Sequence, residues 1–193
     1  MQYTARNYEH LIGTPGFSDT LLKNHFTLYQ GYVTNTNKLS DALASLLQEG
    51  KTGPEYAELR RRFGWEWNGM RLHEYYFDNL GGAGKGGPGS EFTRLVTQTW
   101  GSYENWHKEF TTIGTMRGIG WVVLYQDTAT GNLFNLWINE HDVGHAAGAR
   151  PVVVMDVFEH AFLTDYGLKR ADYVQAFWNN VNWTTVENRV KGK

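Results

Sequence analysis

The chain has 193 residues, enough for one large domain or two small ones, and its shares of hydrophobic (41%) and charged (20%) residues are ordinary for a globular protein. Its net charge is −2 and the charged residues are scattered along the chain, which argues against a nucleic-acid partner. The absence of cysteine excludes disulfides, thiolate nucleophiles and cysteine-ligated metals, so any metal must be held by histidine and carboxylate.

The N-terminal residues MQYTARNYEHLIG lack the basic and then apolar pattern of a signal peptide. No apolar run in the sequence approaches the roughly 18 residues of a transmembrane helix. We therefore expect a cytoplasmic protein that does not cross a membrane.

The first half of the chain has the periodicity of two long helices. Apolar residues recur every three or four positions over residues 18–50, a stretch without proline in which Ser18 or Asp19 is a suitable N-terminal cap. A second helical stretch covers residues 52–80, with Pro54 in its first turn. Because only a short turn separates the two, we expect an antiparallel helical hairpin.

A glycine-rich segment, GGAGKGGPGS, separates the two halves of the chain. It does not fit the phosphate-binding pattern G-x-x-x-x-G-K-[ST], and we interpret it as a flexible connector. We therefore predict a helical-hairpin domain at residues 1–82, a linker at 83–90 and a second domain at 91–193.

The second half changes to a period of two residues. The runs WVVLYQ and LFNLWI flank the turn-forming DTATGN, which predicts a β-hairpin, and PVVVMDV is a third β-branched run. Residues 170–190 return to helical spacing. We expect an α+β fold, with a helical N-terminal part followed by a small α+β part of about three strands.

Two histidines on the predicted helices are candidate metal ligands. His25 and Tyr32 are seven residues apart, which is two helical turns, so both side chains project from one face. His73 lies among aromatic residues on the second helix, where an imidazolium would lose its hydration. Taken singly, each histidine is more simply a core residue packed on aromatic rings. If the hairpin brings them together, however, they form half of a metal site.

The segment MDVFEHAF places Asp156, Glu159 and His160 in an apolar run, where polar groups are costly unless they are paired or bound to a metal. Asp156 and His160 can converge if a strand ends at the aspartate, or if both lie on one face of a helix. The alternative is an aspartate that caps a helix beside a buried histidine. Three histidines and one aspartate suit iron, manganese or zinc, and the residue types alone leave that choice open.

Five segments together resemble the iron/manganese superoxide dismutases over nearly the whole chain. They are NHFTLYQGYVTNTN, LHEYYFDNLGG, GIGWVVLYQD, MDVFEHAFLTDYG and AFWNNVNW. The resemblance implies an N-terminal helical hairpin, a C-terminal domain of helices around a three-stranded antiparallel sheet, and one iron or manganese ion per chain between them. It also implies the disproportionation of superoxide to dioxygen and hydrogen peroxide.

The resemblance further implies a role for each candidate residue. The metal ligands would be His25, His73, Asp156 and His160. Tyr32 would stand at the substrate entrance, His141 would contact the solvent at the metal, and Arg170 would attract the anionic substrate. Glu159 would reach across a subunit interface to His160 of the partner subunit, which implies a homodimer or homotetramer.

Two features depart from the usual pattern of that family. His25 and Tyr32 are one residue closer than usual, and the usual spacing counted back from Tyr32 reaches Asn24. We assign the ligand to His25, because asparagine is a poor ligand here and a helix can lose a one-residue bulge. In that family, a glutamine from one of two places forms a hydrogen bond to the metal-bound solvent. These two places are occupied here by Gly69 and His141, and we assign this role to His141.

Two other functions compete with this interpretation. A non-haem iron oxygenase would use two histidines and one carboxylate with open coordination positions, which a third histidine ligand disfavours. A non-catalytic metal-binding relative would need neither Tyr32 nor His141, and their presence argues against it.

Overall fold

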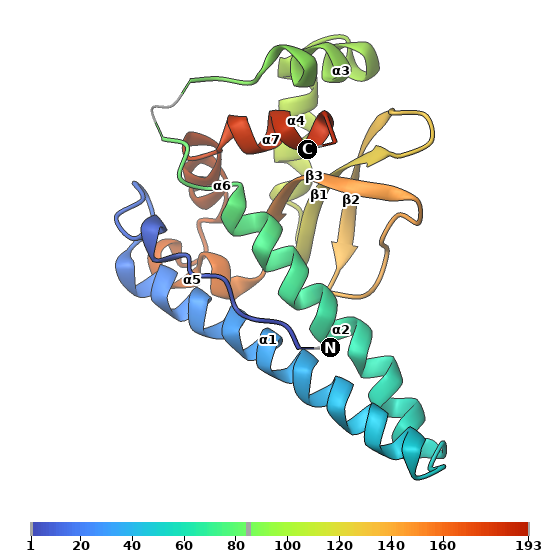
Figure 1. Ribbon diagram of the computed structural model, residues 1–193. Coiled ribbons are helices and arrows are strands. Elements are labelled where there is room, and N and C mark those ends of the chain that lie inside the picture. The colour runs from blue at the N-terminus through green and yellow to red at the C-terminus, as the bar shows by residue number, and fades with distance from the viewer. Residues whose placement is uncertain (1, 84–85, 193) are drawn as a thin grey trace.

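The protein is described by a computed structural model that covers residues 2–83 and 86–192. Its N-terminal half is built on two long antiparallel helices, α1 (Asp19–Gln48) and α2 (Pro54–Asp78), which form the elongated arm of the molecule (Figure 1). Gly84 and Lys85 of the predicted connector lie outside the described residues. The helical hairpin is confirmed, whereas the domain boundaries stay a prediction.

The ends of the hairpin helices have clear local causes. The Ser18 side chain accepts a hydrogen bond from the backbone N–H of Leu21 at 3.1 Å, which satisfies one of the free donors of the first turn of α1. Pro54 is the first residue of α2, where its missing N–H costs nothing. One face of α1 is buried against the rest of the molecule, and it comprises Leu21, Leu22, His25, Phe26, Tyr29, Val33, Thr36 and Leu43.

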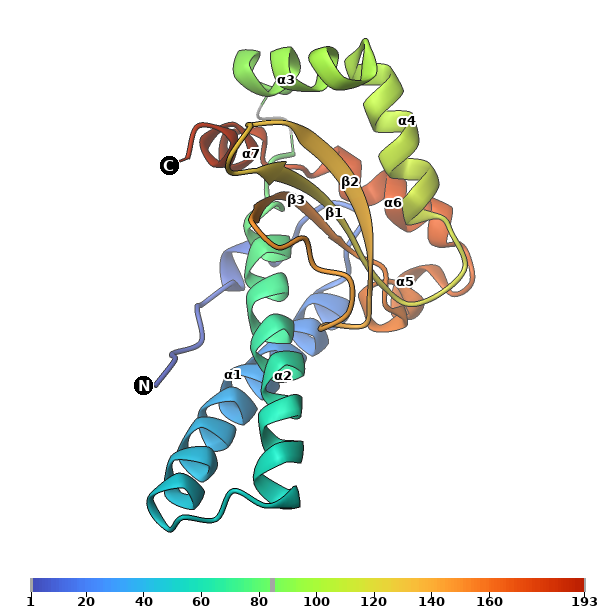
Figure 2. The same cartoon turned by 90° about the vertical axis from the view of Figure 1, so that its right-hand side faces the viewer.

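The second half is an antiparallel sheet surrounded by short helices. The strands are β1 (Gly120–Asp127), β2 (Leu133–Asn139) and β3 (Ala149–Asp156), in the spatial order β2-β1-β3. The sheet lies between α2, which packs on β3, and α4 (Tyr103–Gly114), which packs on β1 (Figures 1 and 2). The remaining helical elements are η1 (Glu9–Leu11), α3 (Ser90–Trp100), η2 (Glu159–Ala161), α5 (Leu163–Tyr166), α6 (Arg170–Asn179) and α7 (Trp183–Val190). The predicted α+β class is confirmed.

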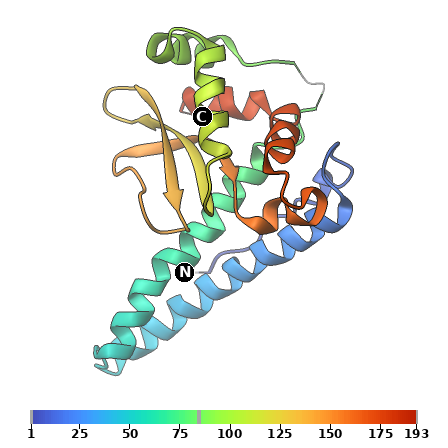
Figure 3. The ribbon, with the colours of Figure 1, turned by 180° about the vertical axis from the view of Figure 1, so that it is seen from behind.

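The helices of the second half differ in part from the prediction. The helices α3 and α4, which are separated only by Gly101 and Ser102, were not predicted from the sequence. The helical spacing predicted for residues 170–190 corresponds to two helices, α6 and α7, and the Asn182 side chain accepts from the backbone N–H of Thr185 at the start of the second. The view from behind shows these C-terminal helices beside the start of α1 and the end of α2 (Figure 3).

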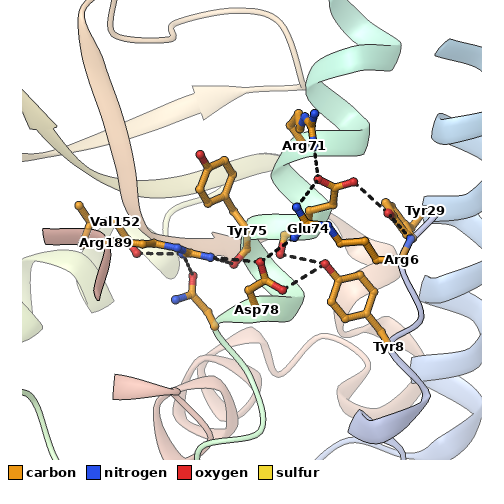
Figure 4. Close-up of polar contacts among 10 residues, drawn as sticks. Arg6, Tyr8, Tyr29, Arg71, Glu74, Tyr75, Asp78, Val152 and Arg189 are labelled. Atoms are coloured by element: carbon orange, nitrogen blue, oxygen red, sulfur yellow. Dashed lines mark hydrogen bonds and ion pairs between the residues drawn. The ribbon is translucent and has the colours of Figure 1, made fainter. Parts of the chain in front are cut away.

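A polar network next to His73 ties the N-terminal segment to both helices of the hairpin (Figure 4). The buried Glu74 of α2 accepts a hydrogen bond from the Tyr29 hydroxyl of α1 at 3.0 Å. One turn further on, Asp78 accepts from Arg6 of the N-terminal segment at 3.1 Å. These contacts fix α1 and α2 relative to each other at the level where the candidate ligands lie.

None of the helices in the described part of the chain is both long and apolar enough to cross a membrane.

Candidate metal centre

Four side chains converge between the helical hairpin and the end of the sheet. His25 comes from α1, His73 from α2, Asp156 is the last residue of β3, and His160 lies in η2. Each offers one ligand atom, and these four atoms all lie within 4.8 Å of one another. Three of the side chains are fully buried, and that of His160 is 28% exposed.

Asp156 is the centre of this cluster. Its Oδ2 lies 3.1 Å from Nε2 of His25, 3.0 Å from Nε2 of His160 and 3.8 Å from Nε2 of His73. Its other oxygen, Oδ1, accepts from the backbone N–H of Phe158 at 2.8 Å. The carboxylate is therefore held by the backbone on one side and presents one oxygen to three imidazoles on the other.

The ring of His73 is oriented so that one nitrogen is available to a metal. Its Nδ1 donates to the carbonyl oxygen of Gly69 at 2.6 Å, so in the neutral ring the lone pair lies on Nε2. That Nε2 is buried and has no hydrogen-bond partner in the described chain. A buried polar atom without a partner is costly, and a metal ion at the centre of the cluster would supply the missing interaction.

Burial and charge set the protonation states that a metal requires. Burial lowers the pKa of His25 and, more strongly, that of His73, so both imidazoles stay neutral. Burial alone would raise the pKa of Asp156, but the charge of His160 and hydrogen bonds from His160 and His25 outweigh it and hold that pKa well below its usual range. Neutral imidazoles and an ionised carboxylate are the forms that bind metals.

The donor set fits iron or manganese. Three imidazole nitrogens and one carboxylate oxygen are of mixed hard and borderline character, which suits either metal. His73 already presents an unprotonated Nε2, whereas His25 and His160 donate through Nε2 to Asp156 and would have to move or release that hydrogen to bind the ion. The remaining space between the four side chains is bordered by Tyr32 and Trp121, whose rings lie 5.2 and 5.0 Å from the ring of His73.

Beside the cluster, a chain of hydrogen bonds connects Trp121, His141 and Tyr32. The indole N–H of Trp121 donates to Nδ1 of the buried His141 at 3.0 Å, and Nε2 of His141 lies 2.6 Å from the Tyr32 hydroxyl. Because an indole N–H only donates, Nδ1 carries the lone pair and Nε2 carries the hydrogen. His141 therefore donates to the Tyr32 oxygen, and the hydrogen of Tyr32 is free to point elsewhere.

Most of the chain is similar in sequence to known metalloenzymes. Residues 88–189 match the family of iron/manganese superoxide dismutases, C-terminal domain. The chain is 34% identical over 183 residues to an iron superoxide dismutase of Saccharolobus solfataricus, covering 92% of this chain and 87% of that protein. It belongs to the iron/manganese superoxide dismutase family.

Relatives named for either metal are similarly close. An iron superoxide dismutase of Cupriavidus metallidurans is 36% identical over 180 residues, covering 90% of this chain and 88% of that protein. The manganese superoxide dismutase 2 of Haloferax volcanii is 32% identical over 177 residues, covering 91% and 88% of the two chains. Membership of this family therefore does not distinguish iron from manganese.

The structure explains how a member of this family accommodates the shorter spacing in its first helix. α1 is a continuous α-helix from Asp19 to Gln48, so His25 and Tyr32 face the same side two turns apart. His25 is 1% exposed, whereas Asn24 faces solvent. Only the histidine can reach the cluster, which favours His25 over Asn24 as the ligand.

Gly69 shows why this chain has no glutamine on its second helix. A Cβ atom at Gly69 would lie 2.6 Å from Cδ1 of Tyr32, which is closer than real Cβ contacts occur. The ring of Tyr32 fills the space that any longer side chain would need. The group that contacts Tyr32 therefore comes from the loop after β2, in the form of His141.

The two remaining predicted residues, Arg170 and Glu159, do not join the ligand cluster. Arg170 is half-buried, and its guanidinium donates to the carbonyl oxygens of Met116 and of Gly118, the latter at 2.6 Å. Glu159 is exposed, and within residues 2–83 and 86–192 it makes neither a side-chain hydrogen bond nor an ion pair.

Sequence reasoning missed two residues that support the site. Trp121 orients His141 through its indole N–H. The buried Tyr173 of α6 donates to the backbone carbonyl oxygen of Asp156 at 2.6 Å and fixes the end of β3. Trp121 lies in an apolar run and Tyr173 on the buried side of a helix, so each looks like an ordinary core residue, and only their positions in space identify them.

Proposed function

We propose that His25, His73, Asp156 and His160 hold one iron or manganese ion per chain, at which the protein disproportionates superoxide to dioxygen and hydrogen peroxide. The observation that carries this proposal is the convergence of four ligand atoms within 4.8 Å, three of them on fully buried side chains. Membership of a family whose named relatives are superoxide dismutases supports the reaction.

The reaction consumes two superoxide anions and two protons and yields one dioxygen and one hydrogen peroxide. An iron or manganese ion held by the four ligands would supply the one-electron exchange that this reaction requires. The chain must deliver the protons. Tyr32 is the proposed donor at the centre, since its oxygen accepts from His141 and its own hydrogen remains free.

Burial keeps this proton on Tyr32 until it is needed. Removal from water raises the pKa of the Tyr32 hydroxyl, and the nearby negative charge of Asp156 raises it further. The phenol therefore stays protonated across the physiological range. The hydrogen bond from His141 fixes the direction of the hydroxyl without competing for its proton.

Arg170 is the proposed attractor of the substrate anion. Its guanidinium is bound by neutral carbonyl groups, and in the described part of the chain it has no carboxylate partner within 4.0 Å. The negative charge of Glu159 lies near enough to act on Arg170. The guanidinium has no direct ion pair, however, so its positive charge can still act on an approaching anion, an effect that salt would weaken.

We further propose a homodimer or homotetramer in which Glu159 binds His160 of the partner subunit. This is supported by the exposed, unpaired carboxylate of Glu159 and by Nδ1 of His160, which has no hydrogen-bond partner in the described chain. The ring nitrogen opposite a metal ligand atom usually donates to a carboxylate or carbonyl group.

The proposed cytoplasmic location rests on the cysteine-free composition.

Reconstitution of the metal-free protein with single metals tests the function. Reconstitution with iron or with manganese should give a metal content of about one ion per chain, and at least one of the two metals should restore superoxide dismutation. Zinc fits the same donors but has no accessible redox change, so the zinc-loaded protein should be inactive. A fully iron- and manganese-loadable protein without activity would leave the site as a non-catalytic metal site.

A further inference from the structure

The loop between β2 and β3 carries a second histidine, His145, which the proposed reaction does not use. Its half-buried ring forms two hydrogen bonds. Nε2 lies 2.7 Å from the backbone carbonyl oxygen of His141, and Nδ1 lies 2.8 Å from the hydroxyl of Tyr125. Because a carbonyl oxygen only accepts, Nε2 carries the hydrogen, and Nδ1 of the neutral ring accepts from Tyr125.

One strand therefore holds His141 in two ways. Trp121 and Tyr125 lie four residues apart on β1, so their side chains leave the same face of the central strand, and both are buried. Trp121 binds the ring of His141 directly. Tyr125 binds His145, which in turn binds the backbone of His141.

The backbone at His141 needs such support. The preceding residue, Glu140, has a φ of 52°, and it is the one non-glycine residue of the described chain in the left-handed region. Such a conformation is unfavourable for a side chain with a Cβ and persists only where its surroundings fix it. A backbone pair between Asn139 and Val143, with N···O distances of 3.1 and 3.4 Å, closes the turn.

We infer that His145 is a positioning residue, which holds the backbone of His141 so that His141 can donate to Tyr32. The kinetic consequence rests on the proposed function, whereas the structural consequence does not. If the His145 bond is lost, the turn at Glu140 relaxes and the 2.6 Å contact between His141 and Tyr32 loosens. Neither the metal ligands nor their immediate hydrogen bonds involve His145.

The test compares four metal-loaded variants with the wild-type enzyme. His145→Ala removes both hydrogen bonds, and Tyr125→Phe removes only the hydroxyl. His145→Gln keeps an amide N–H that can reach the His141 carbonyl. His107→Gln is the matched control, because His107 is a half-buried histidine on α4 whose ring packs on Trp178, 4.4 Å away between centroids. The readouts are metal content, kcat, KM and amide hydrogen exchange over residues 139–148.

His145→Ala should keep its metal and its KM, lose about tenfold in kcat, as supporting groups around metal sites typically do, and exchange faster over residues 139–148. Tyr125→Phe should change kcat and exchange in the same direction by less. His145→Gln should recover most of kcat, and His107→Gln should match the wild type.

Wild-type kcat and wild-type exchange in both His145→Ala and Tyr125→Phe would overturn the inference. So would metal loss in proportion to activity loss in His145→Ala, because that result would give His145 a role in holding the fold or the metal. If the wild-type enzyme itself proves inactive, the proposed function fails, and the exchange measurement alone decides whether His145 positions His141.

Discussion

At the scale of single residues, the account depends most on Asp156, whose Oδ2 faces all three candidate histidine ligands. Asp156→Asn keeps the size of the side chain and an oxygen for the Phe158 N–H, but it removes the negative charge. We expect metal affinity to fall by at least about tenfold, because the loss of a group that only supports a ligand already costs about that much. Metal analysis after dialysis measures the loss. Asp127→Asn, at the end of β1, should retain the wild-type metal content.

Tyr32 gives a second prediction at this scale. Tyr32→Phe keeps the ring that packs on Gly69 but removes the hydroxyl that contacts His141. Metal content should therefore be unchanged, while kcat should fall about tenfold or more because a positioned proton donor is lost. Pulse radiolysis measures this directly. Unchanged kcat in a fully loaded variant would remove Tyr32 from the proton pathway.

The pH dependence of stability follows from His141. Burial lowers the pKa of His141 to about 4, compared with about 6.5 in an unfolded chain. Between these two values the unfolded state binds a proton that the folded state does not. The free energy of unfolding therefore falls as the pH falls, by about 1.4 kcal/mol per pH unit from this residue. His141→Gln should make this loss shallower in urea unfolding of the metal-free protein at pH 6.5, 5.5 and 4.5. An equal slope would contradict the assignment.

At the scale of elements, the close crossing of α1 and α2 depends on Gly69. Gly69→Ala would place a methyl group 2.6 Å from the Tyr32 ring and should displace it, so that kcat falls while the metal is retained. Gly31→Ala is the matched control, because Gly31 lies on the exposed side of α1 with nothing within 4 Å of its added Cβ. The control should keep its activity and gain about 0.5–1 kcal/mol in stability. Equal activity of the two variants would mean that the crossing tolerates the methyl group.

The elements also show how far the sequence could predict the structure. The hairpin and the three strands follow from their periodicity, since long regular segments carry the strongest signal. The choice of His25 over Asn24 could not follow from the family's usual spacing, which points to Asn24, and only the fold shows that His25 is buried while Asn24 faces solvent. The same holds for Trp121 and Tyr173, which support the site from distant elements through single hydrogen bonds.

At the scale of the whole molecule, the candidate centre joins parts of the chain that are far apart in sequence. Its groups come from both hairpin helices, from β3 and from η2, so a bound ion would connect the two halves. Binding to the folded state alone raises its stability by mass action. The metal-loaded protein should therefore unfold at a higher temperature than the metal-free protein in calorimetry.

The proposed assembly belongs to the same scale. Glu159→Ala removes the exposed carboxylate that would bind His160 of the partner subunit, so it should weaken the dimer and lower metal retention together. Sedimentation velocity over a range of protein concentrations measures the first effect, and metal analysis measures the second. A wild-type protein that sediments as a monomer at every concentration would contradict the assembly without touching the metal site.

Anomalous diffraction, collected at the iron and manganese absorption edges from crystals of the enzyme in its active, metal-loaded form, locates the bound ion directly. The proposed metal centre predicts one anomalous peak per chain, bonded to His25, His73, Asp156 and His160. A peak elsewhere, or active crystals with no peak between these four side chains, would contradict it.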